Sequence, residues 1–468
     1  MSPLRTALLL ASILGLLALP AGAAAHEELR GAMPASGDTL AAAPDQLRLT
    51  FVNPVQLGLA HLTLIGPRGT VDLGELRRAS GVAEVLVAPV RGRLVAGTYT
   101  VRWQVAGPDG HPVRGEYTFT IRPDAAGLAP APSQGEVTAP EERAATGAGN
   151  VAVPLSEFDS ESPLYVVVRW LTFVGLLGVI GVVAFRVFVV PLVDRSGSLS
   201  NRAALLAKAS SRAARIGLGA VVVLVVALVL RLCAQLYALH GPVQTFDTAG
   251  VGWLLAGTTW GLGWLLQAGG IVVVAFGLAL TGSRGRAGWT LAAVGASILG
   301  FTPALSGHAA GVQGVGWLAI VADGFHVLGA GGWMGGLLVV VTAGIPVALR
   351  QPTRPEAATA ALINAFSPTA LVFAGVVVAT GVFSAWLHLG EVSALWSTGY
   401  GRTLLLKLGV ASLVFGTGAY NWLKVRPTLG REAAAGRLRR SAVVELVVAL
   451  AVLAVTAVLV ATPLPAAP

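Results

Sequence analysis

The stretch Ala23-Ala24-Ala25-His26 decides on which side of a membrane the rest of the chain folds. Upstream of it lie the basic residue Arg5, an apolar run over 7–19 and the helix breaker Pro20, which is the layout of a secretory signal peptide. We therefore expect cleavage after Ala25, so that the mature chain begins at His26 outside the cytoplasm. The free amine and the ring Nδ1 of such a residue can chelate one metal ion. The alternative is that histidine follows the cleavage site by chance, because any residue can stand there.

The composition indicates one water-exposed domain followed by a membrane domain. Of the 468 residues, 54% are hydrophobic and 12% are charged, whereas soluble domains carry about 25% charged residues. The net charge of +9 is expected to orient the chain in the membrane rather than to bind nucleic acid. Cys233 is the single cysteine, which excludes an intramolecular disulfide and thiolate clusters. With only three methionines, soft sulfur sites are hard to build, but imidazole and carboxylate sites are not.

After the expected signal peptide, residues 1–25, apolar residues alternate with period two up to residue 123. Gly and Pro punctuate these short runs, which predicts an all-β sandwich of cupredoxin- or immunoglobulin-like type over 26–123. Residues 124–163 are rich in Ala, Gly, Pro, Ser and Glu and predict a flexible linker. The predicted strands are 46–53, 61–65, 85–90, 99–105 and 116–121.

Long apolar runs after Pro163 predict an all-α polytopic membrane domain over 164–462 with eight transmembrane helices. Lys and Arg concentrate in the loops that follow spans one, three, five and seven, and the opposite loops contain none. By the positive-inside rule we expect a multi-pass protein of the cytoplasmic membrane, with the N-terminal domain and the C-terminus outside. The predicted spans are 164–193, 214–239, 253–281, 288–305, 316–345, 362–388, 402–423 and 440–462, of which the third and fifth are long enough to tilt or to include interfacial turns.

Two polar residues of the predicted sandwich, Asp109 and His111, are candidate metal ligands. They lie two apart in Pro108-Asp-Gly-His-Pro112, so both side chains can point the same way. Together with His26 they offer an amine, two imidazoles and a carboxylate, a nitrogen and oxygen set that suits Cu(II). The alternative is an ordinary hairpin turn, in which Asp and Gly are favoured.

The histidines of the predicted membrane domain all fall on its outer side. His326 lies in the outer half of span five, three residues after Asp323 and on the same helix face. An ionisable pair inside a span is costly and indicates function, whereas histidines at span ends can simply be tolerated there. The candidate membrane copper ligands are His308, Asp323 and His326, with Met334, His388 and His240 as further candidates.

Other features of the membrane domain are expected to serve packing. The glycines of Gly329–Gly336 let helices approach closely. Arg169 and Lys407 lie near outer span ends, where their heads can snorkel. Glu445 is expected to be a helix-packing partner rather than a metal ligand.

The soluble part resembles the periplasmic copper-resistance protein CopC. The resemblance implies that the mature N-terminal His26 and the Asp109 and His111 of the Asp-Gly-His stretch bind Cu(II). Some members add a Met-rich Cu(I) segment, but 54–61 contains no Met, so we expect no separate Cu(I) site and a surface strand position for His61. The matching motifs are His26-Glu-Glu-Leu29, Pro34-Ala-Ser-Gly-Asp-Thr-Leu40, Leu49-Thr-Phe51, Gly97-Thr-Tyr-Thr-Val-Arg-Trp103 and Asp109-Gly-His-Pro-Val-Arg-Gly115.

The second half resembles the inner-membrane copper-resistance protein CopD, so the whole chain resembles a CopC–CopD fusion. This implies copper handling at the outer face and import. The matching features are Gly307-His-Ala309, Asp323 through His326 to Trp333-Met-Gly-Gly336, Phe366-Ser-Pro368, Gly381-Val-Phe-Ser384 and Thr398-Gly-Tyr-Gly-Arg-Thr-Leu-Leu-Leu-Lys407 with Asn421.

The function expected from the sequence is capture of copper outside and transport, in the direction of import, across the cytoplasmic membrane. No GxxxxGK[ST] loop is present, so we expect no ATP. The expected partners are copper ions and the lipid bilayer, with periplasmic copper proteins as candidates. The alternative is a membrane-anchored copper chaperone or storage protein that loads an enzyme without transport. We expect no enzyme activity: a transmembrane haem stack needs histidines at both depths, and the inner side has none.

Overall fold

The computed structural model describes residues 29–52, 54–79, 82–107, 112–123, 162–195, 201–240, 248–306, 316–428 and 432–462. The expected signal peptide and almost all of the expected linker fall outside these ranges. The candidate ligands His26, Asp109, His111 and His308 also lie outside them, and for His240 only the backbone is described.

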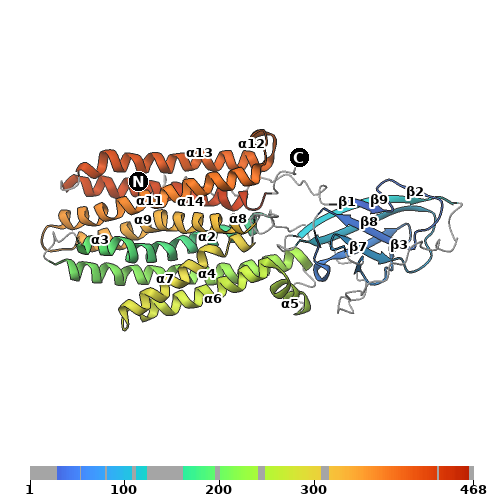
Figure 1. Cartoon of the computed structure of the whole chain (residues 1–468), viewed down its shortest axis with the longest axis horizontal. Coiled ribbons are helices and arrows are strands. Elements are labelled where there is room, and N and C mark those ends of the chain that lie inside the picture. Colours follow the sequence, from blue (N-terminus) through green and yellow to red (C-terminus); the bar gives the residue numbers. More distant parts are fainter. Residues whose placement is uncertain are drawn as a thin grey trace. The chain divides into compact units, whose positions relative to one another are not determined.

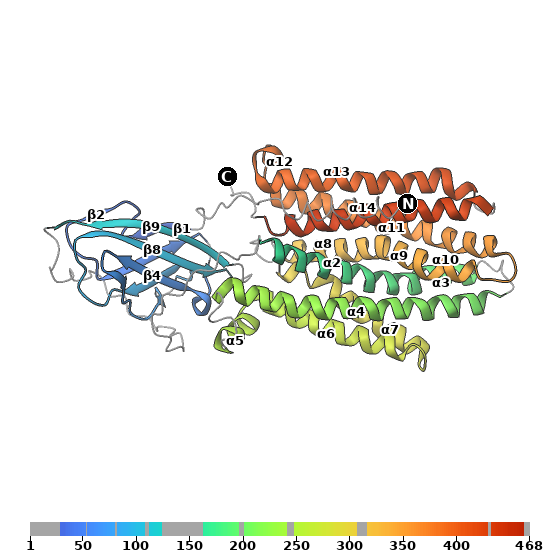
Figure 2. The same ribbon diagram turned by 180° about the vertical axis from the view of Figure 1, so that it is seen from behind.

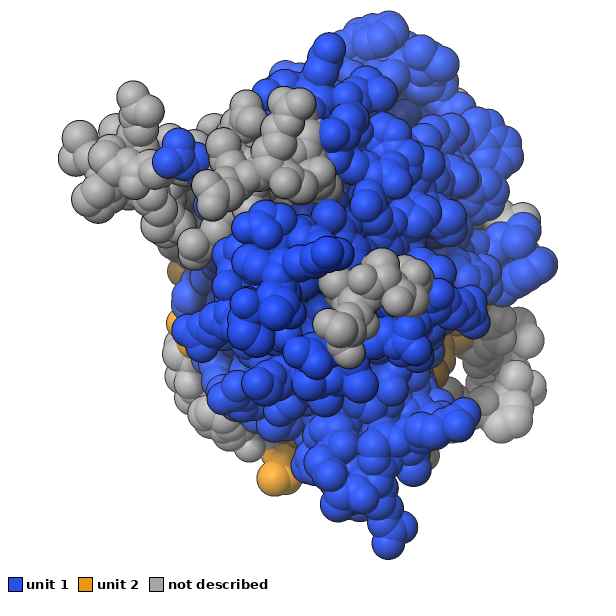
Figure 3. Space-filling view, turned by 90° about the vertical axis from the view of Figure 1, so that its left-hand side faces the viewer, with its two compact units in different colours: residues 1–21, 161–232, 263–468 blue, residues 22–160, 233–262 orange. Residues whose placement is uncertain are grey.

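The chain divides into two compact units, which Figure 3 shows in different colours. One unit comprises residues 1–21, 161–232 and 263–468, and the other comprises 22–160 and 233–262. The expected domain boundaries at 26–123, 124–163 and 164–462 stay predictions.

The N-terminal strands form a two-layer sandwich, as the alternation predicts (Figure 1), in which every strand pair is antiparallel except the short parallel pair of β2 with β9 among the described residues. One sheet has the order β1-β3-β7-β6 and the other β2-β9-β8-β4-β5. The inward residues fill one core, in which Phe51 packs edge-on against Trp103 at 5.3 Å and Tyr99 stacks on Phe119 at 5.4 Å. The strands are β1 Leu29–Met33, β2 Thr39–Leu40, β3 Gln46–Phe51, β4 His61–Gly66, β5 Gly69–Val71, β6 Arg77–Arg78, β7 Val85–Pro89, β8 Gly97–Ala106 and β9 Pro112–Ile121.

All five predicted strands are confirmed, as β3, β4, β7, β8 and β9. Three of the other four strands, β2, β5 and β6, have two or three residues, too few for alternation to identify them, and β1, Leu-Arg-Gly-Ala-Met, lacks a regular alternation of apolar residues. The strand position of His61 is correct, but its side chain is half-buried rather than on the surface.

Within the described residues, eight helices are long and apolar enough to cross a membrane, which agrees with the predicted number. The predicted third span is divided at Thr258, whose Oγ1 accepts a hydrogen bond from the Gly261 amide at 2.9 Å and so caps the second piece. The pieces are α5 Thr248–Gly257 and α6 Thr259–Leu280. The candidate spans are Pro163–Arg195, Arg202–Leu239, Thr259–Leu280, Gly285–Ser306, Gly316–Ala348, Pro355–Leu389, Gly399–Val425 and Arg440–Leu459.

Several of these spans are built from consecutive helical pieces. The last two spans, α13 with η8 and α14, run side by side in Figures 1 and 2. The pieces are α2 Pro163–Ala184, η3 Phe185–Val189, α3 Val190–Arg195, α4 Arg202–His240, α7 Gly285–Phe301, η4 Ala304–Ser306, α8 Gly316–Ala330, η6 Gly331–Gly335, α9 Gly336–Val339, η7 Val340–Gly344, α10 Ile345–Ala348, α11 Pro355–Leu389, α12 Ala394–Ser397, α13 Gly399–Tyr420, η8 Asn421–Val425, η9 Arg426–Thr428 and α14 Glu432–Leu459.

The fifth span crosses α2 at very close range because glycines face each other. It contains two π-helical segments, η6 and η7, within otherwise α-helical structure. A Cβ added at Gly335 would overlap the Leu177 carbonyl oxygen and would lie 2.9 Å from the Gly181 Cα. The packing role predicted for these glycines is therefore confirmed.

Replacing Gly335 by Ala should destabilise the membrane domain, because the two helix backbones must separate. We expect a loss of about 2 kcal/mol of unfolding free energy or more, measured as thermal unfolding of the purified chain in detergent. The matched control is Gly375→Ala in α11, where an added Cβ meets nothing within 4 Å. Since Ala is the better helix former, this control should unfold at an unchanged or higher temperature. Equal losses in both variants would contradict the close crossing.

Candidate metal centre in the membrane domain

Asp323 and His326 lie on one face of α8, as their spacing predicts. Both side chains are half-buried. The neighbouring Gly324 receives the ring of Phe301 from α7, since a Cβ there would meet that ring. Phe301 and Phe325 also pack edge-on at 5.9 Å. These contacts fix the rotation of α8 against α7 and so determine which face carries the carboxylate and the imidazole.

The imidazole of His326 is held against α11. Its Nδ1 lies 3.1 Å from the Thr380 Oγ1. The Thr380 hydroxyl donates its single proton to the Val376 carbonyl at 2.7 Å, so its oxygen accepts from Nδ1–H. Gly381 leaves room for this edge of the ring, since a Cβ there would lie 3.4 Å from the ring Cε1. With Nδ1 protonated, Nε2 keeps its lone pair and is the nitrogen that can bind a metal ion.

A third helix brings a positive charge to the same place. Lys407 of α13 interacts electrostatically with both Asp323 and His326. Tyr400, two turns earlier on α13, is buried and also interacts with Asp323. We name Asp323, His326, Thr380, Tyr400 and Lys407 the α8 cluster. Its carboxylate and ammonium offset each other, which lowers the free-energy cost of charges inside the membrane domain.

The other candidates take different positions. His388, at the end of α11, packs edge-on against Tyr400 at 6.4 Å and so borders the α8 cluster. Met334 is buried in the apolar core of the membrane domain. Within the described residues, no group of three or more His, Cys, Asp and Glu side chains comes together as a metal site. Among the described residues, the candidate site therefore has two protein ligands, Asp323 and His326.

Two further polar residues connect the last two spans. Glu445 of α14 accepts a hydrogen bond from the Asn421 side-chain amide at 3.0 Å. This bond joins adjacent helices, as a helix-packing partner would, and the role of Glu445 stays a prediction.

One titratable group outside the spans has a displaced pKa. Burial, together with the negative charge of Asp38, raises the pKa of Tyr117 well above its ordinary value. The phenol of Tyr117 therefore stays protonated at physiological pH and offers no phenolate ligand to the sandwich.

The sequence gives little indication that the cluster members on α11 and α13 lie next to Asp323 and His326. Tyr400 and Lys407 are seven residues apart, which places them on one helix face, but this spacing does not show which helix they face. Thr380 lies in an apolar run and has no motif of its own. Lys407 is close enough to interact electrostatically with Asp323, an interaction that the snorkelling interpretation did not include.

Three family profiles match the chain in consecutive order. They are the CopC domain over residues 29–122, the copper resistance protein D-like N-terminal domain over 159–317 and copper resistance protein D over 360–459. The chain belongs to the CopC–CopD copper-resistance family. The α8 cluster takes Thr380, Tyr400 and Lys407 from the match over 360–459, and Asp323 and His326 from the stretch between the two copper resistance protein D matches.

Two curated relatives illustrate the two parts. Copper transport protein CutJ of Bacillus subtilis (strain 168) is 26% identical over 472 residues, 97% of this chain and 77% of the relative. Copper resistance protein C of Escherichia coli is 36% identical over 107 residues, 21% of this chain and 84% of the relative. The crystal structure of PcoC, a copper resistance protein from Escherichia coli, has 27% identity and a TM-score of 0.19 and covers 20% of this chain and 99% of that one.

Removing the hydroxyl that orients His326 should weaken copper binding at the α8 cluster. In a chain that also carries Asp109→Ala and His111→Ala, we expect Thr380→Val to lower copper affinity about 10- to 100-fold, as is usual for partners that orient a ligand. The measurement is a copper titration of the purified chain. The control is Thr417→Val on α13, whose hydroxyl bonds only to its own helix at Leu413 and Val414. Equal affinities in the two variants would contradict the assignment of Nε2 as the ligand atom.

Proposed function

We propose that the chain captures copper outside the cytoplasm and imports it across the cytoplasmic membrane. The observation that carries the proposal is the α8 cluster, in which Asp323 and His326 lie within a candidate span of a CopD-type domain. An ionisable pair at such a position is costly and is retained where ions or protons pass.

The charge of Lys407 favours passage over storage. A site that conducts must bind its ion strongly enough to admit it and weakly enough to release it. An ammonium group that interacts with the same carboxylate competes with a bound cation and lowers its affinity. A storage site would bind copper more tightly without this positive charge. The cluster therefore supports transport with transient binding of copper.

The proposed capture site is formed by His26, Asp109 and His111 and binds Cu(II). Its support is the resemblance to CopC, together with the positions of the described strand ends nearest to these residues in the sequence. Leu29, at the start of β1, pairs with Phe51, whose ring packs on Trp103 near the end of β8. His26 is three residues before Leu29, within about 10 Å of it even when extended. The start of β1 and the last residues of β8 thus belong to one end of the sandwich.

The proposed route runs from the capture site to the α8 cluster. The expected linker over 124–163 would keep the copper-loaded sandwich at high effective concentration near the membrane domain. His308 and His388 are proposed to complete or border the membrane site, and His240 and Met334 remain further proposed ligands. The proposed orientation has the N-terminal domain and the C-terminus on the periplasmic side.

A copper chaperone without transport is the second candidate function. It would load a periplasmic enzyme from the capture site and would use the membrane domain only as an anchor. The relatives CutJ and copper resistance protein C are named for copper transport and copper resistance, so neither name favours an enzyme.

Blocking the mature N-terminus should weaken Cu(II) binding. A chain that retains one extra residue before His26 loses the chelate of amine and imidazole, and we expect its Cu(II) affinity to fall at least about tenfold. N-terminal sequencing of the exported protein and Cu(II) titration of both forms provide the measurement. An uncleaved leader, or unchanged affinity in the extended form, would remove His26 from the site.

Cellular copper content should separate import from the chaperone role. With His326→Ala we expect intracellular copper to fall to the level of cells that lack the chain, because the α8 cluster no longer admits the ion. His61→Ala, a histidine change in the sandwich outside both proposed sites, should keep the wild-type level. Intracellular copper that is unchanged without the chain, together with a poorly metallated periplasmic enzyme, would instead establish the chaperone.

A further inference from the structure

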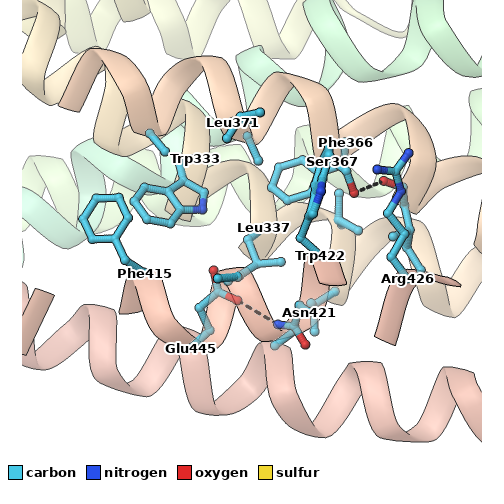
Figure 4. Close-up of a pocket in the computed structure, with 18 of the residues that line it drawn as sticks. Trp333, Leu337, Phe366, Ser367, Leu371, Phe415, Asn421, Trp422, Arg426 and Glu445 are labelled. Carbon is cyan, nitrogen blue, oxygen red and sulfur yellow. Dashed lines mark hydrogen bonds between the residues drawn. The ribbon is translucent and has the colours of Figure 1, made fainter. Parts of the chain in front are cut away.

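A second polar position of the membrane domain lies on the wall of a cavity (Figure 4). The cavity has a volume of about 400 Å³ and is enclosed by pieces of the last four spans. This size falls within the range of small-molecule sites, about 300–1,000 Å³. Its lining is almost wholly apolar and includes four aromatic side chains, Trp333, Phe366, Phe415 and Trp422.

The charged group on this wall is the carboxylate of Glu445, which is 3% exposed. It accepts hydrogen bonds from two neutral groups, the Asn421 amide at 3.0 Å and the Trp333 indole. A carboxylate has about four lone-pair sites, so it retains acceptor capacity towards the cavity. Both donors come from π-helical segments, η6 and η8, which are frequent at functional sites.

The one other charged residue in the described lining, Arg426, makes its contacts with residues other than Glu445. Arg426 donates to the Asn364 side chain at 2.9 Å and stacks over Trp422 at 4.3 Å. Within the described part of the chain, no Lys or Arg forms an ion pair with Glu445. A buried carboxylate without a cation is unfavourable, because few interactions offset the loss of its hydration, and it is stabilised either by taking up a proton or by a cation in the cavity. The cavity therefore offers a place for a positive charge.

The aromatic lining suits a cation with an apolar body. Trp333 and Phe415 lie 4.8 Å apart, centroid to centroid, beside the Glu445 carboxylate in Figure 4. Aromatic faces attract cations, most strongly where water is excluded. A small hydrated metal ion would find few oxygen ligands on this wall and would leave most of the apolar volume unused.

The cavity is accessible from the side that faces lipid. Two of its lining residues, Leu371 of α11 and Leu423 of η8, are 63% and 66% exposed on helices of the membrane domain. Large apolar side chains exposed on a membrane span are in contact with acyl chains. A lipophilic ligand dissolved in the bilayer can therefore enter between these two helices without crossing water.

We propose that this cavity binds a lipophilic organic monocation, which pairs with the Glu445 carboxylate and lies against Trp333 and Phe415. The proposal uses no residue of the α8 cluster and is independent of the copper function. Charge complementarity selects the ligand's sign, and the aromatic walls accept its apolar body.

The test compares two ions of the same shape and opposite charge on the purified full chain in a non-ionic detergent. We expect saturable equilibrium binding of tetraphenylphosphonium and at least about tenfold weaker binding of its anionic isostere, tetraphenylborate. This comparison uses the wild-type chain and so does not depend on how a variant folds. Equal binding of the two ions, or no saturable binding of the cation, would overturn the proposal and leave the cavity to neutral acyl chains.

A variant then assigns the site to Glu445. Glu445→Gln keeps an acceptor for Asn421 and Trp333 and removes the charge, so tetraphenylphosphonium affinity should fall at least about tenfold. The matched control is Glu391→Gln, because Glu391 is exposed and its side chain bonds only to Ser393 among the described residues. Unchanged binding in Glu445→Gln, with an unchanged thermal unfolding temperature, would refute the role of the carboxylate.

Discussion

In the α8 cluster, Asp323 and Lys407 attract each other inside an apolar helix bundle, and this attraction offsets the smaller part of the cost of burying the two groups. Each charge alone would be unfavourable there, and together they are tolerated. The chemistry of His326 is set by the Thr380 hydroxyl, which accepts from Nδ1–H and so leaves Nε2 available as the ligand atom. A carboxylate is a hard ligand and a neutral imidazole is an intermediate one. Such a pair can bind the copper ion that we propose the chain transports.

The scaffold holds these groups through close helix contacts rather than through a large polar network. Gly335 lets the fifth span touch α2 at Gly181, and Gly381 makes room for the His326 ring on α11. The π-helical segments of the fifth span place Trp333 towards Glu445, well along the helix from His326. One continuous span therefore carries both the proposed metal ligands and one wall of the organic-cation cavity.

Much of this architecture follows from periodicity. Alternation identified the long strands β8 and β9 because each residue faces either core or solvent, whereas β2 and β6 are two residues long and have no period to detect. Hydropathy found all eight spans, and spacing put Asp323 and His326 on one face. The partners of that face were not predictable, because only the packing of α8 against α11 and α13 brings Thr380 and Lys407 to it. The ligands proposed for the sandwich rest on the resemblance to CopC, since His26, Asp109 and His111 lie outside the described residues.

The most direct test uses two variants of Lys407. For each variant, copper affinity is measured on the purified chain and copper uptake is measured in sealed vesicles. If the ammonium keeps binding transient, Lys407→Leu should bind copper at the α8 cluster more tightly than wild type and transport it more slowly. Lys407→Arg, which keeps the charge, should resemble wild type in both respects. A Lys407→Leu chain with unchanged or weaker copper affinity and unchanged uptake would contradict the account.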